Sequence, residues 1–243
     1  MNKYLNALVA STFAAILTAC GGGGTTAVTP TGPVTSTLSF PVAQAMATDA
    51  SAGSSSNFTI AQTGSVSCSG SGNITRAPAT TSTTFNITPT NTVSALSAVE
   101  TITLNWTNCT PSTSVTTATL YYTPTTYVPL GLNSVGVNYG AYLTAPSYPA
   151  TVMVGGTGII GTENLYTDST EVTSNGRIDG SYVVTADTAT TAIITVIGKE
   201  YDASSVLVFT EQDAYRITAT GVVTRISTNV QYANGINVTF TYN

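Results

Sequence analysis

The chain has 243 residues and is nearly uncharged, because Asp, Glu, Lys and Arg make up only 7% of it, against about 25% in an average soluble domain. Six basic and eleven acidic side chains give a net charge of −5, and the sequence contains no histidine. Binding to a nucleic-acid backbone needs clustered lysine and arginine, whereas the basic residues here are scattered. We therefore exclude a nucleic acid as a partner.

Residues 1–20 have the form of a bacterial export leader, with Lys3 before an apolar stretch from Leu5 to Leu17. At ~1.5 Å per residue the stretch spans ~20 Å, short of the ~30 Å hydrocarbon core, so a permanent transmembrane helix is not expected. The residues Leu17-Thr18-Ala19-Cys20 resemble the lipobox of bacterial lipoproteins. This resemblance implies that residues 1–19 are a signal peptide, and that Cys20 carries the acyl chains, including palmitate, that anchor the protein.

An ordinary secretory signal with a chance cysteine is the alternative, but the glycine run Gly21–Gly24 is typical of a lipoprotein tether. By the sorting rule of the lipoprotein family, Gly21 after the cysteine, in place of aspartate, implies the outer membrane. We expect residues 20–37 to form the acylated cysteine and a flexible linker, and residues 38–243 to form a single β-rich domain.

Strand periodicity dominates the rest of the chain. A short helix is predicted near 41–48, with Pro41 suited to its first turn. The later pattern predicts strands at 101–107, 177–185, 190–200, 206–209, 217–226 and 236–242, with hairpin turns at Asn175-Gly176 and Asn234-Gly235. Short, turn-rich connections favour an all-β fold, an antiparallel meander that forms a sandwich or a curled sheet or open barrel.

Three cysteines become two when Cys20 is acylated, which leaves Cys68 and Cys109. In an oxidising compartment these two should form a disulfide, worth ~4 kcal/mol in the chain-entropy model. Two free buried thiols are the alternative. A metal site is not expected, because two thiolates without histidine fall short of a zinc shell.

The two cysteines lie in the segments Ser65–Gly72 and Leu104–Cys109. These segments resemble a pattern in uncharacterised exported β-rich proteins of Gram-negative bacteria, in which a Gly/Ser-rich strand is tied to a strand that ends in Asn-Cys. The resemblance implies the disulfide and no activity.

Tyrosines are concentrated in a stretch, residues 101–162, that contains no charged residue. Six of them, Tyr121, Tyr122, Tyr127, Tyr139, Tyr142 and Tyr148, are candidate ligand contacts, because exposed tyrosines can stack on sugars or line a protein interface. The alternative is that they fill the rim of the core, since tyrosine favours strands.

Other motifs carry weaker signals. The glycines Gly156, Gly158 and Gly161 match a dinucleotide fingerprint, but no helical pattern follows them, so a β-turn is favoured. The acid pairs Glu200/Asp202 and Glu211/Asp213 would raise one another's pKa if neighbouring strands brought them together; solvated strand ends are the alternative. Oxygen ligands for calcium occur between residues 163 and 179 but match no calcium-loop motif: Glu163, Asp168, Glu171, Asn175 and Asp179.

Nucleophilic catalysis lacks a base, because no histidine is present and Lys199 is the single lysine that remains after processing. We therefore expect a non-catalytic envelope lipoprotein with a structural or interaction role and no cofactor. The expected partners are the membrane, through the anchor, and envelope proteins or glycans. The alternative function is a carbohydrate-binding or adhesive module that uses the tyrosines of residues 121–148.

Overall fold

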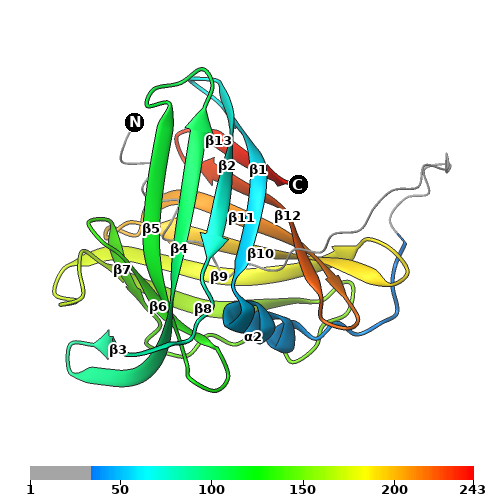
Figure 1. The fold of residues 1–243 in the computed structure, drawn as a ribbon, viewed down its shortest axis with the longest axis horizontal. Helices are drawn as coiled ribbons and strands as arrows, with labels where there is room; N and C mark the ends of the chain where they lie inside the picture. The colour runs from blue at the N-terminus through cyan, green and yellow to red at the C-terminus, as the bar shows by residue number, and fades with distance from the viewer. Residues whose placement is uncertain (1–33) are drawn as a thin grey trace.

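The computed structural model describes residues 34–243 and confirms the predicted all-β fold (Figure 1). The described helix is α2 (Val42–Ala52). The strands are β1 (Ser54–Thr63), β2 (Cys68–Arg76), β3 (Thr81–Thr88), β4 (Asn91–Trp106), β5 (Thr113–Tyr122), β6 (Pro129–Ser134), β7 (Asn138–Ala141), β8 (Thr157–Tyr166), β9 (Ser174–Ala186), β10 (Thr191–Tyr201), β11 (Leu207–Thr218), β12 (Val223–Tyr232) and β13 (Asn237–Tyr242).

The strands form an antiparallel meander that closes on itself. From β4 to β13 each strand pairs with the next one in sequence, β13 pairs with β1, and β1 pairs with β2. Pairing of β2 with the second half of β4 completes the ring, in which Gly70 lies opposite Trp106 and Arg76 opposite Glu100. The expected curled sheet is therefore a closed barrel, and no described strand except β3 lies outside the ring.

Strand β3 pairs with the first half of β4 and folds over the outer side of the barrel wall (Figure 1). Its Phe85 ring stacks on Tyr139 of β7 and tilts against Tyr121 of β5, with ring centroids 5.2 and 4.7 Å apart. This contact forms a small second core outside the barrel.

Strict alternation of buried and exposed residues builds the main core. On β10 the inward positions are Ala192, Ile194, Val196, Gly198 and Glu200, and the residues between them are less buried. Successive side chains of a strand point to opposite faces, so a period of two places one set inside the barrel. The predicted strand at 190–200 forms as β10, and the segment predicted at 206–209 forms the start of β11.

The predicted helix forms as α2, directly after Pro41, and it ends at Gly53, whose φ of +72° suits a residue without a side chain. The buried face of α2, with Val42 and Ala45, packs on inward residues of β8–β12. The segment before α2 is held to the β7–β8 connection by the reciprocal backbone hydrogen bonds of Phe40 and Val152. Helix and connection together cover this part of the inner face.

Two predicted boundaries differ from the structure. Asn234-Gly235 forms the expected turn, but Asn175-Gly176 lies inside β9, and the turn comes earlier, at residues 167–173. Gly176 is needed there because a Cβ would lie 1.9 Å from the Tyr201 carbonyl oxygen. The predicted strand 217–226 is interrupted by a turn in which Gly221 has a φ of +82°.

Part of the expected linker contacts the domain. The Val34 amide donates to the Asp187 carbonyl at 3.3 Å, and the buried Ser36 hydroxyl donates to the Ala189 carbonyl at 2.9 Å. Among the described residues, contacts with the domain are therefore made from Val34 onward, which includes four residues of the expected linker. Cys20 and the rest of the linker lie outside the described residues.

Deletion of residues 34–37 should lower the free energy of unfolding by about 1–2 kcal/mol, because these two hydrogen bonds and the burial of Ser36 are lost. Deletion of residues 21–33 alone should leave the free energy of unfolding unchanged. Denaturant unfolding of the two truncated proteins makes the comparison, and equal stabilities would contradict a structural role for Val34 and Ser36.

Candidate functional site

The six candidate tyrosines do not form an exposed row. Tyr122, Tyr139 and Tyr142 are buried, and Tyr121, Tyr127 and Tyr148 are half-buried. Tyr122 points into the barrel, whereas Tyr139 packs beneath β3 and donates its hydroxyl proton to the Asn86 carbonyl at 2.7 Å. Stacking on a sugar requires an exposed ring face, so this arrangement gives the carbohydrate-binding alternative no support.

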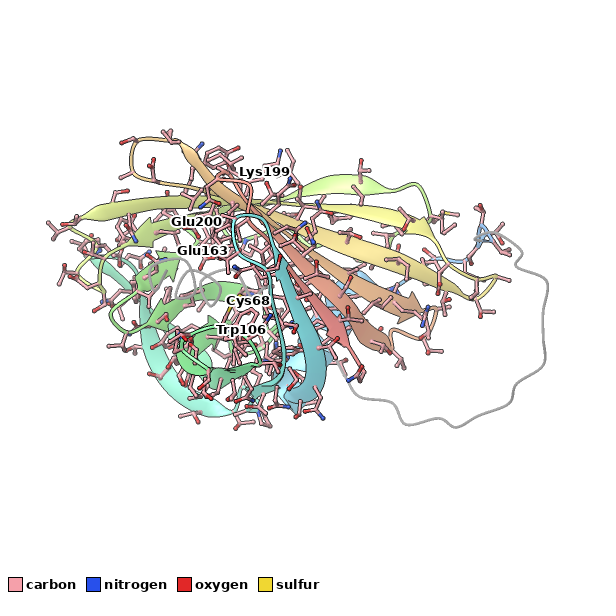
Figure 2. The ribbon with its side chains drawn as sticks, turned by 90° about the horizontal axis from the view of Figure 1, so that it is seen from above. Cys68, Trp106, Glu163, Lys199 and Glu200 are labelled. Atoms are coloured by element: carbon pink, nitrogen blue, oxygen red, sulfur yellow. A yellow bond between two sulfur atoms is a disulfide. The ribbon has the colours of Figure 1, made fainter. Side chains whose placement is uncertain are left out.

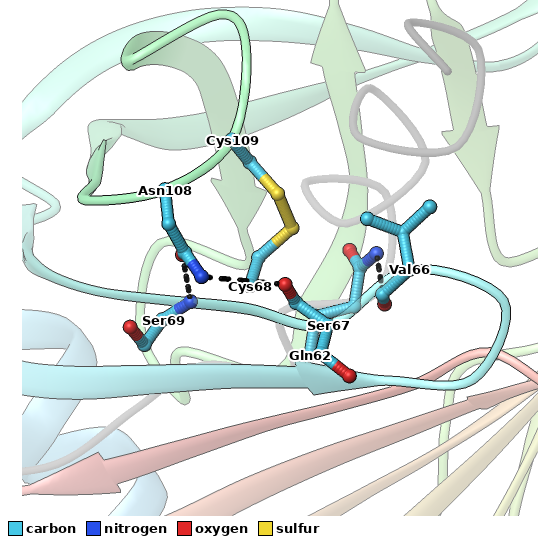
Figure 3. The surroundings of a disulfide bond; sticks show 7 residues. All are labelled: Gln62, Val66, Ser67, Cys68, Ser69, Asn108 and Cys109. Carbon is cyan, nitrogen blue, oxygen red and sulfur yellow. Dashed lines mark hydrogen bonds between the residues drawn. A yellow bond between two sulfur atoms is a disulfide. The ribbon is translucent and has the colours of Figure 1, made fainter.

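The predicted disulfide between Cys68 and Cys109 is present, with the Cα atoms 5.7 Å apart (Figure 3). Asn108 holds both neighbours of Cys68: its Oδ1 accepts from the Ser69 amide at 2.8 Å, and its Nδ2 donates to the Ser67 carbonyl at 3.4 Å. The Asn-Cys pair thus fixes the end of β4 against the start of β2 at the ring-closing contact.

Replacement of Cys68 and Cys109 by alanine should lower the free energy of unfolding by about 2–4 kcal/mol, because the unfolded chain regains a loop of 41 residues. Asn108→Ala should lower it by about 1 kcal/mol with the disulfide intact. Urea unfolding of both variants and of the reduced wild-type protein measures these losses. If reduction leaves the free energy of unfolding unchanged, the disulfide does not stabilise the fold.

Most acidic residues of the chain lie inside the barrel or close against it. Seven of the eleven acidic residues are buried, together with two arginines. Charged side chains normally lie on the surface of a protein. These residues are Asp49, Glu100, Glu163, Glu171, Glu200, Glu211, Asp213, Arg76 and Arg225. Burial of a charge costs several kcal/mol unless it is paired, so such a concentration marks the interior as the candidate site.

The first group joins α2 to the barrel wall. Arg76, at the end of β2, forms an ion pair with Asp49 of α2 and also donates to the Asp49 carbonyl at 3.1 Å. Burial raises the pKa of Asp49 to about 6 even though Arg76 lowers it. Burial alone would lower the pKa of Arg76, but Tyr122, Asp49 and Glu100 raise it overall.

The second group lies between β11, β12 and β13. Arg225 donates to the hydroxyls of Tyr242 at 2.9 Å and Tyr215 at 3.3 Å, and its guanidinium lies 4.9 Å from the Tyr242 ring centroid. Glu211 and Asp213 face inward as the strand period predicts, and burial raises the pKa of Asp213 although Arg225 lowers it. The Thr228 hydroxyl donates to Asp213.

The third group is a pair of carboxylates that form no ion pair with a basic residue of the described range, 34–243. Glu163 of β8 and Glu200 of β10 both pair with Ile178 of β9, so the two side chains lie in one row with their Cα atoms about 10 Å apart. Figure 2 shows both on the inner side of the strands and Lys199 on the outer side. Burial, helped by Glu200, raises the pKa of Glu163 to about 8, and burial raises that of Glu200 to about 7.

Two tyrosines of the β7–β8 connection, Tyr142 and Tyr148, are affected by the charge of Glu163. Burial raises the pKa of the Tyr142 hydroxyl, and Glu163 and Tyr148 raise it further. Burial, Tyr122 and Glu163 likewise raise the pKa of Tyr148. The Tyr148 hydroxyl and the Oε2 atom of Glu200 are buried without a hydrogen-bond partner among the described residues.

The expected acid pairs are only partly realised. Glu200 faces inward, but Asp202 lies in the exposed turn before β11, where its carboxylate accepts from the amides of Ser204 and Val206. The turn expected at the glycines 156–161 is confined to residues 154–155, because Gly158 and Gly161 lie within β8, and no helix follows them as a dinucleotide site would require. Within residues 34–243 no three or more Cys, Asp and Glu side chains are grouped to hold a metal ion.

Sequence reasoning missed Asp49, Arg76, Glu100 and Arg225 as site residues. Glu100 stands between Ala98 and Ile102, and Glu211 and Asp213 stand between Phe209 and Tyr215, at inward positions of their strands. A charged residue in the apolar phase of a strand was the signal that could have found the interior groups.

Comparison with known proteins gives no relative: no family model, no curated protein and no solved structure matches this chain. In residues 34–243 no helix is both long and apolar enough to cross a membrane.

Proposed function

We propose that the protein is a lipid-anchored protein of the bacterial outer membrane with a non-catalytic, structural or interaction role. The sequence Leu17-Thr18-Ala19-Cys20 supports the anchor. The observation that supports a non-catalytic role is the placement of the acids. Glu163, Glu200 and Glu211 are each at most 8% exposed, so a substrate in solution does not reach them.

An interaction role has one suitable surface, the free half of β5. Residues 113–118 pair with β4 on one side, but β6 joins the other side only from Thr119 onward. A groove beside this edge is lined by Val115–Thr119 and Asn133–Val137, and Val115 and Val135 are 61% and 87% exposed. An uncharged, β-branched edge without protective lysines suits an extended segment of an envelope protein.

The anchor is tested by the intact mass of the protein extracted from membranes. The mass should show the loss of residues 1–19 and the addition of acyl groups, and Cys20→Ala should abolish both changes and move the protein out of the membrane fraction. An unmodified wild-type amino terminus would contradict the assignment.

The interaction surface is tested with a photoreactive residue at position 135 in intact cells, with position 172 as the matched control, because Val172 is 83% exposed on a different turn. A discrete crosslinked product is expected from position 135 alone, and Thr117→Lys should remove it by placing a charge on the edge. Equal products from both positions, or a product that T117K leaves unchanged, would contradict this surface.

A further inference from the structure

One end of the barrel brings together the segment that starts at Val34 and the turns of two hairpins. The Val34 amide bonds to Asp187 in the β9–β10 turn, and the segment that follows bonds to the β7–β8 connection. The β11–β12 turn also contacts this segment, since a Cβ on Gly221 would lie 3.2 Å from the Pro41 ring. Figure 1 shows this end to the right, where the blue segment passes the yellow and orange hairpins. The linker end, as we call it, consists of residues 34–41, 152–156, 187–191 and 216–222.

The linker end exposes several large apolar side chains. Those that are 38–52% exposed are Val34, Leu38, Met153 and Val222. Single exposed apolar residues are ordinary on a protein surface. Here three segments that are far apart in the sequence each bring one or two of them to the same end of the barrel. Such a concentration is typical of an interaction surface.

The charges of the linker end fit a lipid surface better than those of the opposite end. Within the linker end the charged residues are Asp187 and Arg216, and they form an ion pair with each other at 2.6 Å. At the opposite end the exposed Val172 shares its turn with the exposed Asp168, and the β10–β11 turn carries the exposed Asp202. An unpaired carboxylate is costly to move into the headgroup layer, where it loses water and meets lipid phosphates. The linker end is therefore the end that suits a bilayer.

The expected acyl anchor brings this same end to the membrane. From Cys20 to Val34 the chain can span at most about 50 Å, at ~3.3–3.6 Å per residue. The turns of the opposite end lie a further strand length away, because β9 and β10 are ~35–45 Å long. A tether of this length raises the effective concentration of the linker end at the lipid surface, so a contact made by few apolar side chains is sufficient.

We propose that the linker end rests on the bilayer that holds the anchor, with Val34, Leu38, Met153 and Val222 in the headgroup layer. The inference rests on the proposed lipid anchor and adds to it a second, non-covalent membrane contact that orients the barrel. The groove beside the free half of β5 stays accessible in this orientation. It includes the β6–β7 turn, and β7 pairs with β8 at Tyr166, the end of β8 away from the membrane.

The test uses the full-length acylated protein, with the modification confirmed by intact mass, in phosphatidylcholine vesicles that contain a lipid with a nitroxide on its headgroup. A fluorescent label is attached, without reductant, to Met153→Cys or Val222→Cys. Val135→Cys and Val172→Cys are the matched controls on exposed turns of the opposite end. Labels at 153 and 222 should lose intensity and labels at 135 and 172 should keep it, because nitroxides quench only at short range.

A second set of variants separates the apolar contact from the tether. With the label on Leu38→Cys, the pair Met153→Glu and Val222→Glu should remove most of the quenching, because two carboxylates then enter the contact. The pair Val135→Glu and Val172→Glu adds the same charge at the opposite end and should leave the quenching unchanged.

Four results would overturn this membrane contact although the protein is acylated: no quenching at any position, equal quenching at all positions, quenching confined to 135 and 172, or wild-type quenching in the variant with glutamates at the linker end. Each of them leaves the anchor standing. A mass without acyl groups would instead contradict the anchor itself, so the two failures are distinguishable.

Discussion

Replacement of Glu163 by glutamine should make the domain more stable at about pH 8.5, by on the order of 4 kcal/mol, and should change its stability little at about pH 5. In the unfolded chain this carboxyl ionises near pH 4.5, whereas burial and the neighbouring Glu200 raise its pKa in the folded protein to about 8. Between these values the folded state holds a proton that the unfolded state has lost. Stability therefore falls as the pH rises through this window.

Glu200→Gln should act in the same direction but less strongly, because its pKa rises only to about 7. Gln212→Ala, on the exposed face of β11, removes no ionisable group and is the control. Urea unfolding at several pH values gives the free energies. A wild-type stability that does not fall between pH 5 and 8.5, or a Glu163→Gln variant with the wild-type slope, would show that these carboxyls ionise normally.

Arg76→Met should lower the free energy of unfolding by about 3–5 kcal/mol, because it leaves Asp49 and Glu100 buried without their arginine. Loss of this ion pair also removes a bond that holds α2 to β2, so α2 should lose protection against amide hydrogen exchange before the strands do. Denaturant unfolding and residue-level exchange measure the two effects.

Arg216→Met is the control for that change. Arg216 also pairs with an aspartate, Asp187, at 2.6 Å, but its side chain is 47% exposed, so the loss should be below about 1 kcal/mol. The double variant Asp49→Asn with Arg76→Met should recover part of the stability lost in the single one, because no uncompensated aspartate then remains. Equal losses in Arg76→Met and Arg216→Met would show that burial does not decide the strength of these pairs.

The strand content and its phase could be read from the sequence because both depend on local alternation. Residues 102–106 and 236–242 show the period of two that a half-buried strand requires, and Asn234-Gly235 suits the backbone of a tight turn. The turn predicted at Asn175-Gly176 was wrong because the glycine there has a different role: Gly176 allows β9 to pass close to the Tyr201 carbonyl. A local signal cannot distinguish a turn from a close approach between distant strands.

The interior groups could not be predicted for a related reason. Glu163 and Glu200 are 37 residues apart, and they share a row only because β9 places Ile178 between them. That register depends on the bulge near Gly161, which shifts the pairing of β8 by one residue. The disulfide was predictable from the cysteine count, but the closure of the ring at this bond was not.

The pairing of β1 with β13 imposes an order on synthesis. Phe58 lies opposite Tyr242, 184 residues further along the chain, so the edge of β1 stays uncovered until β13 has been synthesised. Until then the open edges of β1 and β12 are exposed together, which is the condition under which unfinished β-proteins associate with one another. A nascent chain of this protein would therefore need a holding factor up to its final strand, and a chain that stops before Asn237 should accumulate as aggregates rather than as a smaller folded domain.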